Sequence, residues 1–289
     1  MKGRVISRIY AGMGNQMFQY AAGRALALRS GSAFQLDCRH LESHGSPGYG
    51  LKHFNIDRAL TPGKLPPQRK GQRIRHYLWR KLKLRPLLIA QNGPSFDERL
   101  LTPLTDVFLD GYWQSERYFS DAADTIREDY RFITPPDLDN ARWLDEIGNS
   151  PAISLHLRRG DYLKLEVHAE FGMPTLEYYA DALEFVASRI TAEPVVYVFS
   201  DEPDWARDNL VLPFEKRVMA HNGSERNYED MRLMSACRHH IIANSSFSWW
   251  GAWLNPSPEK IVVAPQRWFA DPKVDIPDIV PEGWHRVAG

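Results

Sequence analysis

Several features that often reveal the class of a protein are scarce or missing in this sequence. It has two cysteines, Cys38 and Cys237, which lie far apart without the spacing of a metal or redox motif, so we expect buried free thiols. Its 36 basic and 36 acidic residues cancel, so no net field recruits nucleic acid or an anionic membrane. No long apolar run follows the N-terminal basic residues, so we expect a cytoplasmic protein with neither signal peptide nor membrane span.

Two catalytic signatures are also missing. No Asp-x-Asp follows an apolar strand, and the nearest candidate, Asp121 with Asp124, lies in a helical pattern. His239 and His240 are adjacent and point apart, which is poor geometry for a metal. A nucleophile elbow, Gly-x-Ser-x-Gly, does not occur. We therefore expect no bound metal and no serine nucleophile.

The length and composition allow an enzyme of about two domains. Hydrophobic residues make up 43% of the 289 residues, which is ordinary for a globular protein. A turn of Gly, Asn, Ser and Pro at residues 148–151 suggests a boundary, so we expect domains at 1–149 and 150–289. The second half alternates apolar strands with helical segments, which predicts an α/β fold with a parallel sheet.

The chain opens with a strand, a glycine-rich loop and an alanine-rich helix at residues 17–28. Gly12 and Gly14 match the first two glycines of a dinucleotide-binding turn, but Met17 stands where the third belongs. The loop either brings backbone N–H groups to an anion or is a tight turn that needs glycine torsions. An NAD-dependent oxidoreductase with Asp37 on the ribose is the alternative function that this segment suggests.

The most informative stretch is residues 153–162. Alternating apolar and polar residues predict a strand that runs into a turn at Gly160. Arg158 and Arg159 follow this strand, at the sheet edge where open parallel sheets bind ligands. Two guanidiniums could grip phosphate oxygens from two directions, whereas the plainer interpretation is a charged strand end with a surface turn.

Two more strands of the second half end in polar residues, which parallel pairing should bring to the same edge. Ser200 and Asp201 end one of them, and we expect Asp201 to accept from a ribose or a base. Ser245 and Ser246 follow another, before a helix at residues 249–254, where they form either a phosphate cradle or an ordinary helix cap. We expect three tryptophans of that helix in the core: Trp249, Trp250 and Trp253.

Two stretches of the first half could contact ligands. Residues 69–85 are strongly basic with interleaved apolar residues; a phosphate or lipid contact is one interpretation, and a solvated helical face is favoured. Residues 108–114 form a strand end with aromatic and amide groups that suit a sugar face, although packing in the core explains the aromatics as well.

Four motifs in order resemble those of the bacterial α-1,2-fucosyltransferases of glycosyltransferase family 11. They occupy residues 12–21, 156–162, 199–202 and 244–255, so the resemblance spans nearly the whole chain. It implies a GT-B architecture, with the acceptor bound by the first domain and GDP-fucose by the second across a cleft. It also implies metal-independent, inverting transfer of L-fucose from GDP-β-L-fucose to the 2-hydroxyl of a galactoside, in an oligosaccharide or a lipid-linked glycan, and no cofactor.

The same resemblance assigns site residues. Arg158 and Arg159 would hold the diphosphate, and an inverting displacement needs a base. Asp161 lies beside two cations and is expected to orient them; Glu166 and His168 are the other candidates for the base, unless they belong to a solvated loop. The donor site would comprise Asn15, Gln16, His156, Arg158, Arg159, Asp161, Ser200, Asp201, Asn244, Ser245, Ser246 and Phe247. Of these, Asn15 and Gln16 belong, with Gln19, to the N-terminal motif that faces the cleft. A carbohydrate-binding module without catalysis is the third interpretation, for which paired arginines are superfluous.

Overall fold

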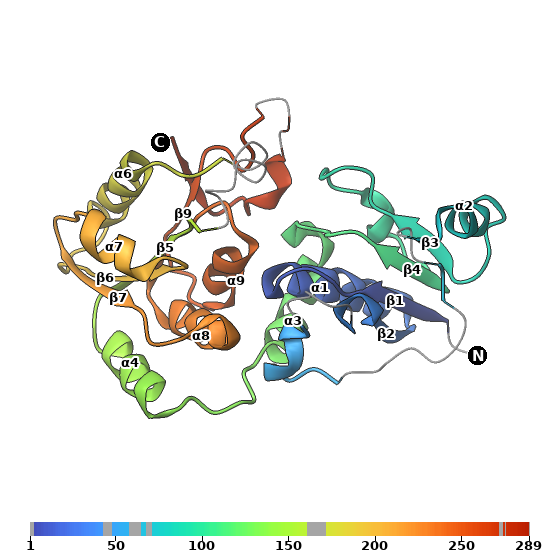
Figure 1. The fold of residues 1–289 in the computed structure, drawn as a ribbon, viewed down its shortest axis with the longest axis horizontal. Coiled ribbons are helices and arrows are strands. Elements are labelled where there is room, and N and C mark those ends of the chain that lie inside the picture. The colour runs from blue at the N-terminus through green and yellow to red at the C-terminus, as the bar shows by residue number, and fades with distance from the viewer. Residues whose placement is uncertain are drawn as a thin grey trace. The chain divides into compact units, whose positions relative to one another are not determined.

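The computed structural model describes residues 3–42, 48–57, 65–67, 71–160, 172–271, 274 and 276–288 (Figure 1). The chain divides into two compact units, residues 1–133 and 134–289. The sequence predicted a boundary after residue 149, so the division lies earlier than expected. The reason is α4 (Leu138–Gly148), whose Ile147, Trp143 and Leu144 pack in an apolar cluster of the second unit.

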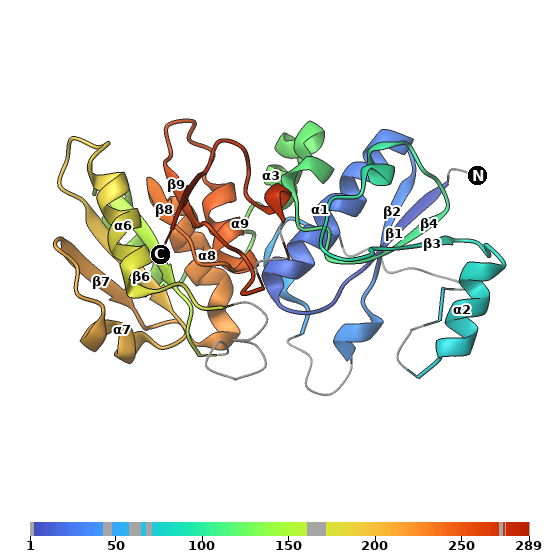
Figure 2. The same ribbon diagram turned by 90° about the horizontal axis from the view of Figure 1, so that it is seen from above.

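The first unit contains a four-stranded parallel sheet. Its strands are β1 (Arg4–Arg8), β2 (Ala33–Asp37), β3 (Leu87–Ala90) and β4 (Val107–Asp110), in the order β2-β1-β4-β3. The long helix α1 (Met13–Ser30) lies against this sheet, as Figure 2 shows, and most of its side chains are buried. The predicted β-loop-α-β start is therefore present.

Helix α1 begins at Met13, earlier than the predicted start at residue 17. Gly14, Asn15 and Gln16 thus form its first turn instead of a loop. Gly12 precedes the helix with φ −69°, and a Cβ added there would meet nothing within 4 Å. Because neither torsion nor space requires glycine at this position, the turn lacks the geometry that makes the dinucleotide motif depend on it.

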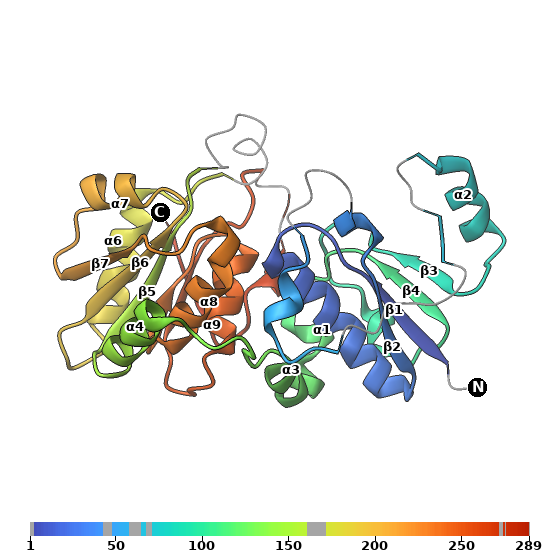
Figure 3. The same ribbon diagram turned by 60° about the horizontal axis from the view of Figure 1, so that its bottom comes forward.

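Besides α1, the described residues of the first unit form two shorter α-helices, together with short 3-10 turns. Helix α2 (Arg73–Lys81) is anchored by the buried Trp79, whose indole N–H donates to the Pro86 carbonyl at 3.0 Å. Trp79 also packs with Ile6, Leu88 and Phe108 of the sheet. Helix α3 (Ala123–Asp129) buries Ile126. Figure 3 shows α2 beside β3, the edge strand.

The second unit contains a six-stranded parallel sheet, as predicted. Its order is β10-β9-β8-β5-β6-β7, with every pair parallel. The strands are β5 (Ala152–Leu157), β6 (Val195–Ser200), β7 (Glu215–Met219), β8 (His239–Ile241), β9 (Val262–Pro265) and β10 (His285–Val287). After α4, the α-helices in the described part of this unit are α6 (Leu176–Ala187), α7 (Pro203–Asn209), α8 (Asn227–Ala236) and α9 (Ser246–Leu254).

The tryptophans of α9 form a buried cluster, as expected from the sequence. Trp249 is fully buried, its indole N–H donates to the Ile279 carbonyl at 2.6 Å, and its ring stacks with Trp253 at 6.3 Å between centroids. Both cysteines are buried free thiols, also as expected. No helix in the described part of the chain is long and apolar enough to cross a membrane.

Candidate functional site

The carboxyl ends of β5 and β6 meet at one edge of the second sheet. Leu157 and Ser200 are paired in register, so the residues that follow them lie close together. One carboxylate oxygen of Asp201 accepts the backbone N–H of Arg159 at 2.9 Å, and the other lies 3.1 Å from Nη1 of Arg158. That Asp201 accepts from a ribose or a base stays a prediction, and in the structure each of its carboxylate oxygens already has one partner from the turn after β5.

The second arginine is held by different groups. The guanidinium of Arg159 lies 3.4 Å from the centroid of the Trp205 ring in α7, and its Nε donates to Glu202 at 3.2 Å. Stacking and an ion pair together fix the plane of this guanidinium. The side chain of Arg158 is 29% exposed and that of Arg159 18%, so Arg158 is the more accessible cation.

The turn that carries Arg158 and Arg159 is held against the end of β6 by contacts with Asp201. A Cβ added at Gly160 would lie 3.0 Å from Oδ2 of Asp201, so a larger residue would press on the carboxylate that pairs with Arg158. The Ser200 hydroxyl accepts the backbone N–H of Glu202 at 3.0 Å and fixes the adjacent turn. The backbone of the site is thus set before any ligand binds.

His156 lies one residue before the end of β5 and is 5% exposed. Its ring is 5.7 Å from that of Phe247 in α9, between centroids. The pKa of His156 is lowered to about 3, chiefly by burial and also by the Arg158 charge, while the Asp201 charge opposes both. Nδ1 is buried without a hydrogen-bond partner among the described residues. The imidazole is therefore neutral at physiological pH, with one nitrogen uncommitted.

The end of β8 lies beside β5, because Ile241 pairs with Leu155. Helix α9 begins at Ser246, earlier than the predicted residue 249, and Ser245 caps it: the Ser245 hydroxyl accepts the N–H of Phe247 at 3.3 Å. Asn244 donates its amide to the Trp268 carbonyl at 3.1 Å. The structure thus gives Ser245 the capping role that the sequence left open.

Some predicted site residues cannot be placed. Asp161, Glu166 and His168 lie outside the described residues. Within the residues that the structure describes, no group of three or more His, Cys, Asp or Glu is arranged to hold a metal ion.

We expect the depressed pKa of His156 to make unfolding pH-dependent. The folded protein binds fewer protons than the unfolded chain between the ordinary value of 6.5 and about 3. Its contribution to stability is thus complete above pH 6.5 and lost as the pH falls toward 3, by at most about 1.4 kcal/mol per pH unit. Urea midpoints measured at falling pH should drop less steeply in His156→Asn than in His285→Asn, an exposed control. Equal slopes in the two variants would contradict a buried neutral imidazole.

The first sheet carries a second polar edge. Arg8, the last residue of β1, is 3% exposed and donates to Asp110, the last residue of β4, at 2.6 Å. Asp37 ends β2 and receives two hydrogen bonds from Arg39, at 2.7 and 2.8 Å. Burial raises the pKa of Asp37, but the hydrogen bonds and charge of Arg39 hold it below its usual range. A carboxylate already bonded in this way is poorly suited to a ribose, which counts against the oxidoreductase alternative.

Aromatic rings continue this edge. The rings of Tyr10 and Tyr112 are 5.1 Å apart between centroids, and Tyr112 is 42% exposed. The residues after them, Ala11 and Trp113, have φ of 64° and 55°, which is unusual for residues other than glycine. Gln91, directly after β3, accepts the N–H groups of Tyr112 and Trp113 at 2.9 and 3.0 Å. The strained turn is therefore held in place from the neighbouring strand.

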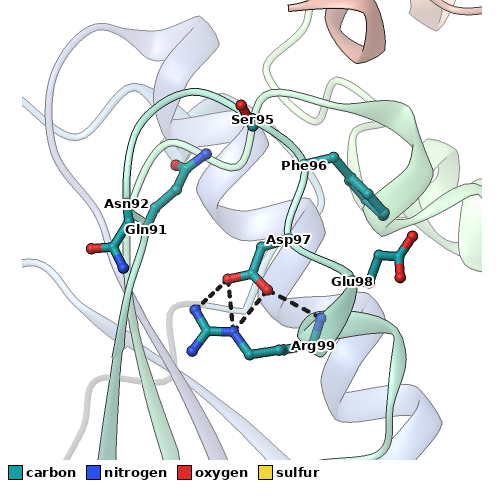
Figure 4. Close-up of a pocket in the computed structure, with 7 residues that line it drawn as sticks. All are labelled: Gln91, Asn92, Ser95, Phe96, Asp97, Glu98 and Arg99. Atoms are coloured by element: carbon teal, nitrogen blue, oxygen red, sulfur yellow. Dashed lines mark hydrogen bonds and ion pairs between the residues drawn. The ribbon is translucent and has the colours of Figure 1, made fainter.

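A cavity opens next to Gln91. Its volume is about 260 Å³, and Figure 4 shows Gln91 and Asn92 on one side of it with Phe96 and Asp97 across from them. Arg99 binds the Asp97 carboxylate, with Nε–O distances of 2.8 and 3.0 Å. Neither this cavity nor the ion cluster at Arg8 was predicted from the sequence. A signal for the ion cluster was present, because three apolar strands of this unit each end in a charged residue.

The N-terminal motif contributes mainly to structure within its own unit. The Gln16 amide donates to the carbonyls of Ala11 and Gly48 and accepts the N–H of Gly50, all within 2.8–2.9 Å. Gln19 is fully buried and accepts the N–H of Tyr10 at 2.9 Å. Asn15 is half-buried and accepts from the Gln114 amide. Gln16 and Gln19 thus hold the strand end and its following loop in position.

Each of the two units has a parallel sheet with polar and charged residues at the carboxyl ends of its strands, and this architecture matches that of known structures. The structure resembles NodZ α-1,6-fucosyltransferase soaked with GDP-fucose, with a TM-score of 0.50 and 15% identity over 89% of this chain and 94% of that chain. It also resembles POFUT1 in complex with GDP, with a TM-score of 0.51 and 12% identity over 91% and 98% of the two chains. The fold is that of the GT-B fucosyltransferases.

The sequence comparisons narrow the class to a family. Residues 91–288 match the model of glycosyl transferase family 11. An α-1,2-colitosyltransferase of Escherichia coli is 33% identical over 98% of both chains, and the O-antigen biosynthesis glycosyltransferase WbnK of the same species is 33% identical over 91% of this chain and 94% of that one. Galactoside α-(1,2)-fucosyltransferase 1 of Lagothrix lagotricha is 27% identical over 83% of this chain and 62% of its own. The chain belongs to glycosyltransferase family 11.

Proposed function

We propose that this protein transfers L-fucose from GDP-β-L-fucose to the 2-hydroxyl of a galactoside, with inversion and without a metal ion. The observation that carries the proposal is the pair of arginines at the joined ends of β5 and β6 in a chain of family 11. A galactose-containing oligosaccharide or lipid-linked glycan, such as an O-antigen precursor, is the acceptor class that the relatives support.

In this proposal the donor diphosphate binds at Arg158 and Arg159. A departing diphosphate carries negative charge that must be stabilised, and two fixed guanidiniums can supply what a divalent ion supplies in other transferases. Asp201 and Glu202 hold these cations in position before the donor arrives. The start of α9 at Ser246 offers a further polar contact to the nucleotide.

The acceptor hydroxyl also needs a base on the face opposite the leaving group. Glu166 and His168 are our candidates, and Asp161 is assigned to orienting the arginines. The acceptor itself is assigned to the edge of the first sheet, where the exposed Tyr112 ring suits the apolar face of a sugar and the Asp110 carboxylate, 18% exposed, suits its hydroxyls.

GDP-colitose is a second candidate donor, because one of the similar proteins is a colitosyltransferase. The α-1,2-colitosyltransferase of Escherichia coli matches 98% of this chain. Colitose is L-fucose without its 3-hydroxyl, so the two donors differ in a single polar group. A site built to hydrogen-bond that hydroxyl should reject the deoxy sugar by about 10⁴-fold, whereas a site that merely tolerates it should discriminate far less.

The test is a transfer assay with the purified full chain in excess EDTA. GDP-fucose and GDP-colitose are offered separately with lactose, and the product linkage is assigned by NMR. We expect fucosyl transfer to the 2-hydroxyl of galactose in the presence of the chelator. Loss of activity in EDTA with recovery in manganese or magnesium would contradict the role given to the arginines. Transfer from GDP-colitose but not from GDP-fucose would show that GDP-colitose is the donor.

A further inference from the structure

The stretch around α2 is basic in a chain that is otherwise balanced. Between Asp57 and Asp97 the sequence contains no acidic residue, whereas the whole chain has 36 basic and 36 acidic residues. The positive charge is therefore local to this part of the first unit. Its described cations, all exposed, are Arg73, Arg75, Arg80, Lys81, Lys83 and Arg85.

Helix α2 also presents apolar side chains to solvent. Ile74 is 77% exposed, Tyr77 61%, Leu78 44% and Leu82 63%. Leu82 follows the helix directly and its N–H donates to the Leu78 carbonyl at 2.9 Å, so it continues the same turn. These residues lie at i, i+3, i+4 and i+8, which places them on one face. We call these four residues the α2 stripe.

The opposite face of α2 is the one that packs on the sheet. His76 and Trp79 are the buried residues of the helix, and Trp79 anchors it through the cluster with Leu88. Among the described residues of its own unit, the α2 stripe is thus not used in packing. In the rest of the described chain, strongly exposed apolar residues such as Leu138 and Val211 do not form such a stripe.

The cations flank the α2 stripe. Helical periodicity places Arg73 and Arg80 along one side of it and Arg75 along the other, with Lys81 within it. Apolar side chains bordered by lysine and arginine are the pattern of a helix that lies in a bilayer interface. We propose that α2 docks this protein on the anionic surface of a lipid bilayer, with the α2 stripe entering the interface and the flanking cations contacting lipid phosphates.

The assignment of an anionic bilayer as the partner depends on both the α2 stripe and the cations that flank it. A nucleic acid would use the cations but leave Ile74 and Leu82 in water, and a purely apolar partner would leave the cations unpaired. An anionic bilayer satisfies both at once. The docking is independent of which sugar the protein transfers.

The test is co-sedimentation of the full chain with phosphatidylcholine vesicles, with and without phosphatidylglycerol, at low and high salt. We expect binding only to the anionic vesicles, weakened by salt. Ile74→Ser combined with Leu78→Ser should reduce the partition coefficient by at least tenfold. Arg80→Gln and Lys81→Gln should each reduce it about fivefold.

Matched substitutions elsewhere serve as controls. Leu138→Ser and Arg142→Gln alter an exposed leucine and an exposed arginine of α4, and both should bind vesicles like the unchanged protein. Because Ile74 and Leu78 are exposed, their variants should keep the thermal midpoint. Absence of binding to anionic vesicles, equal binding to neutral ones, or full binding by the Ile74 and Leu78 variant would each overturn the proposal, as would duplex DNA displacing the protein from vesicles.

Discussion

Replacing Arg158 with lysine is expected to reduce both GDP affinity and kcat/KM by about 10- to 150-fold. Lysine keeps the charge but loses the planar fork that binds two oxygens, which corresponds to roughly 1.5–3 kcal/mol for a charge-assisted hydrogen bond. The guanidinium of Arg158, which is 29% exposed and lies 3.1 Å from Asp201, is the cation that we propose receives the diphosphate. Calorimetry with GDP and transfer kinetics measure the two effects separately.

Arg159→Lys should reduce GDP affinity and kcat/KM to a similar extent if both guanidiniums hold the diphosphate. It should also affect thermal stability. The stack on Trp205 is lost as well, so the thermal midpoint should fall slightly in this variant but not in Arg158→Lys. Arg142→Lys, on the exposed surface of α4, is the control and should match the unchanged protein. Native GDP affinity in both variants would refute the assignment of the diphosphate to these arginines.

Trp249→Ala is expected to destabilise the second unit by about 3–5 kcal/mol. The side chain is fully buried, contacts Trp250 edge-to-face, stacks with Trp253, and donates a hydrogen bond to the Ile279 carbonyl. Its removal leaves both a large cavity and an unpaired acceptor. Because two units need not unfold together, the shift is read from the urea transition followed by circular dichroism, and limited proteolysis identifies which unit has opened.

Trp205→Ala provides the contrast for this experiment. That ring is half-buried and supports Arg159, so its loss should lower GDP affinity while changing stability less than Trp249→Ala. A smaller loss of stability in Trp249→Ala than in Trp205→Ala would show that the α9 cluster is not the centre of the core.

The fold of the second unit could be predicted because its strands are short, apolar and followed by polar turns. The alternation at residues 153–157 and the nearly continuous apolar run of β6 each have a local cause in the sequence, and parallel pairing then fixes which ends meet. The convergence of Arg158 with the end of β6 followed from that rule alone. The sugar specificity came instead from the resemblance of four motifs to those of a known family, because hydrophobic periodicity carries no information about the substrate.

What could not be predicted depended on contacts distant in the sequence. The partners of Asp201 are Arg158 and the N–H of Arg159, which follow a different strand, β5, and nothing near Asp201 in the chain indicates them. The early start of α1 has a similar origin, because the Gln16 side chain bonds to Gly48 and Gly50 on a separate segment. Where such hydrogen bonds join segments that are distant in the sequence, they determine the local structure more than the secondary-structure propensity of the segment does.

The carboxylates beside the two arginines also bear on which anions the protein can hold. Because Arg158 already pairs with Asp201 and Arg159 with Glu202, an incoming anion must compete with a partner that is part of the chain. Inorganic phosphate or sulfate can challenge one pair at a time and gains little, whereas a diphosphate can engage both guanidiniums together. We therefore expect poor inhibition by simple salts of these anions. If the arginines hold the diphosphate as proposed, the same carboxylates can pair with them again after transfer, which would favour release of the spent nucleotide before another turnover.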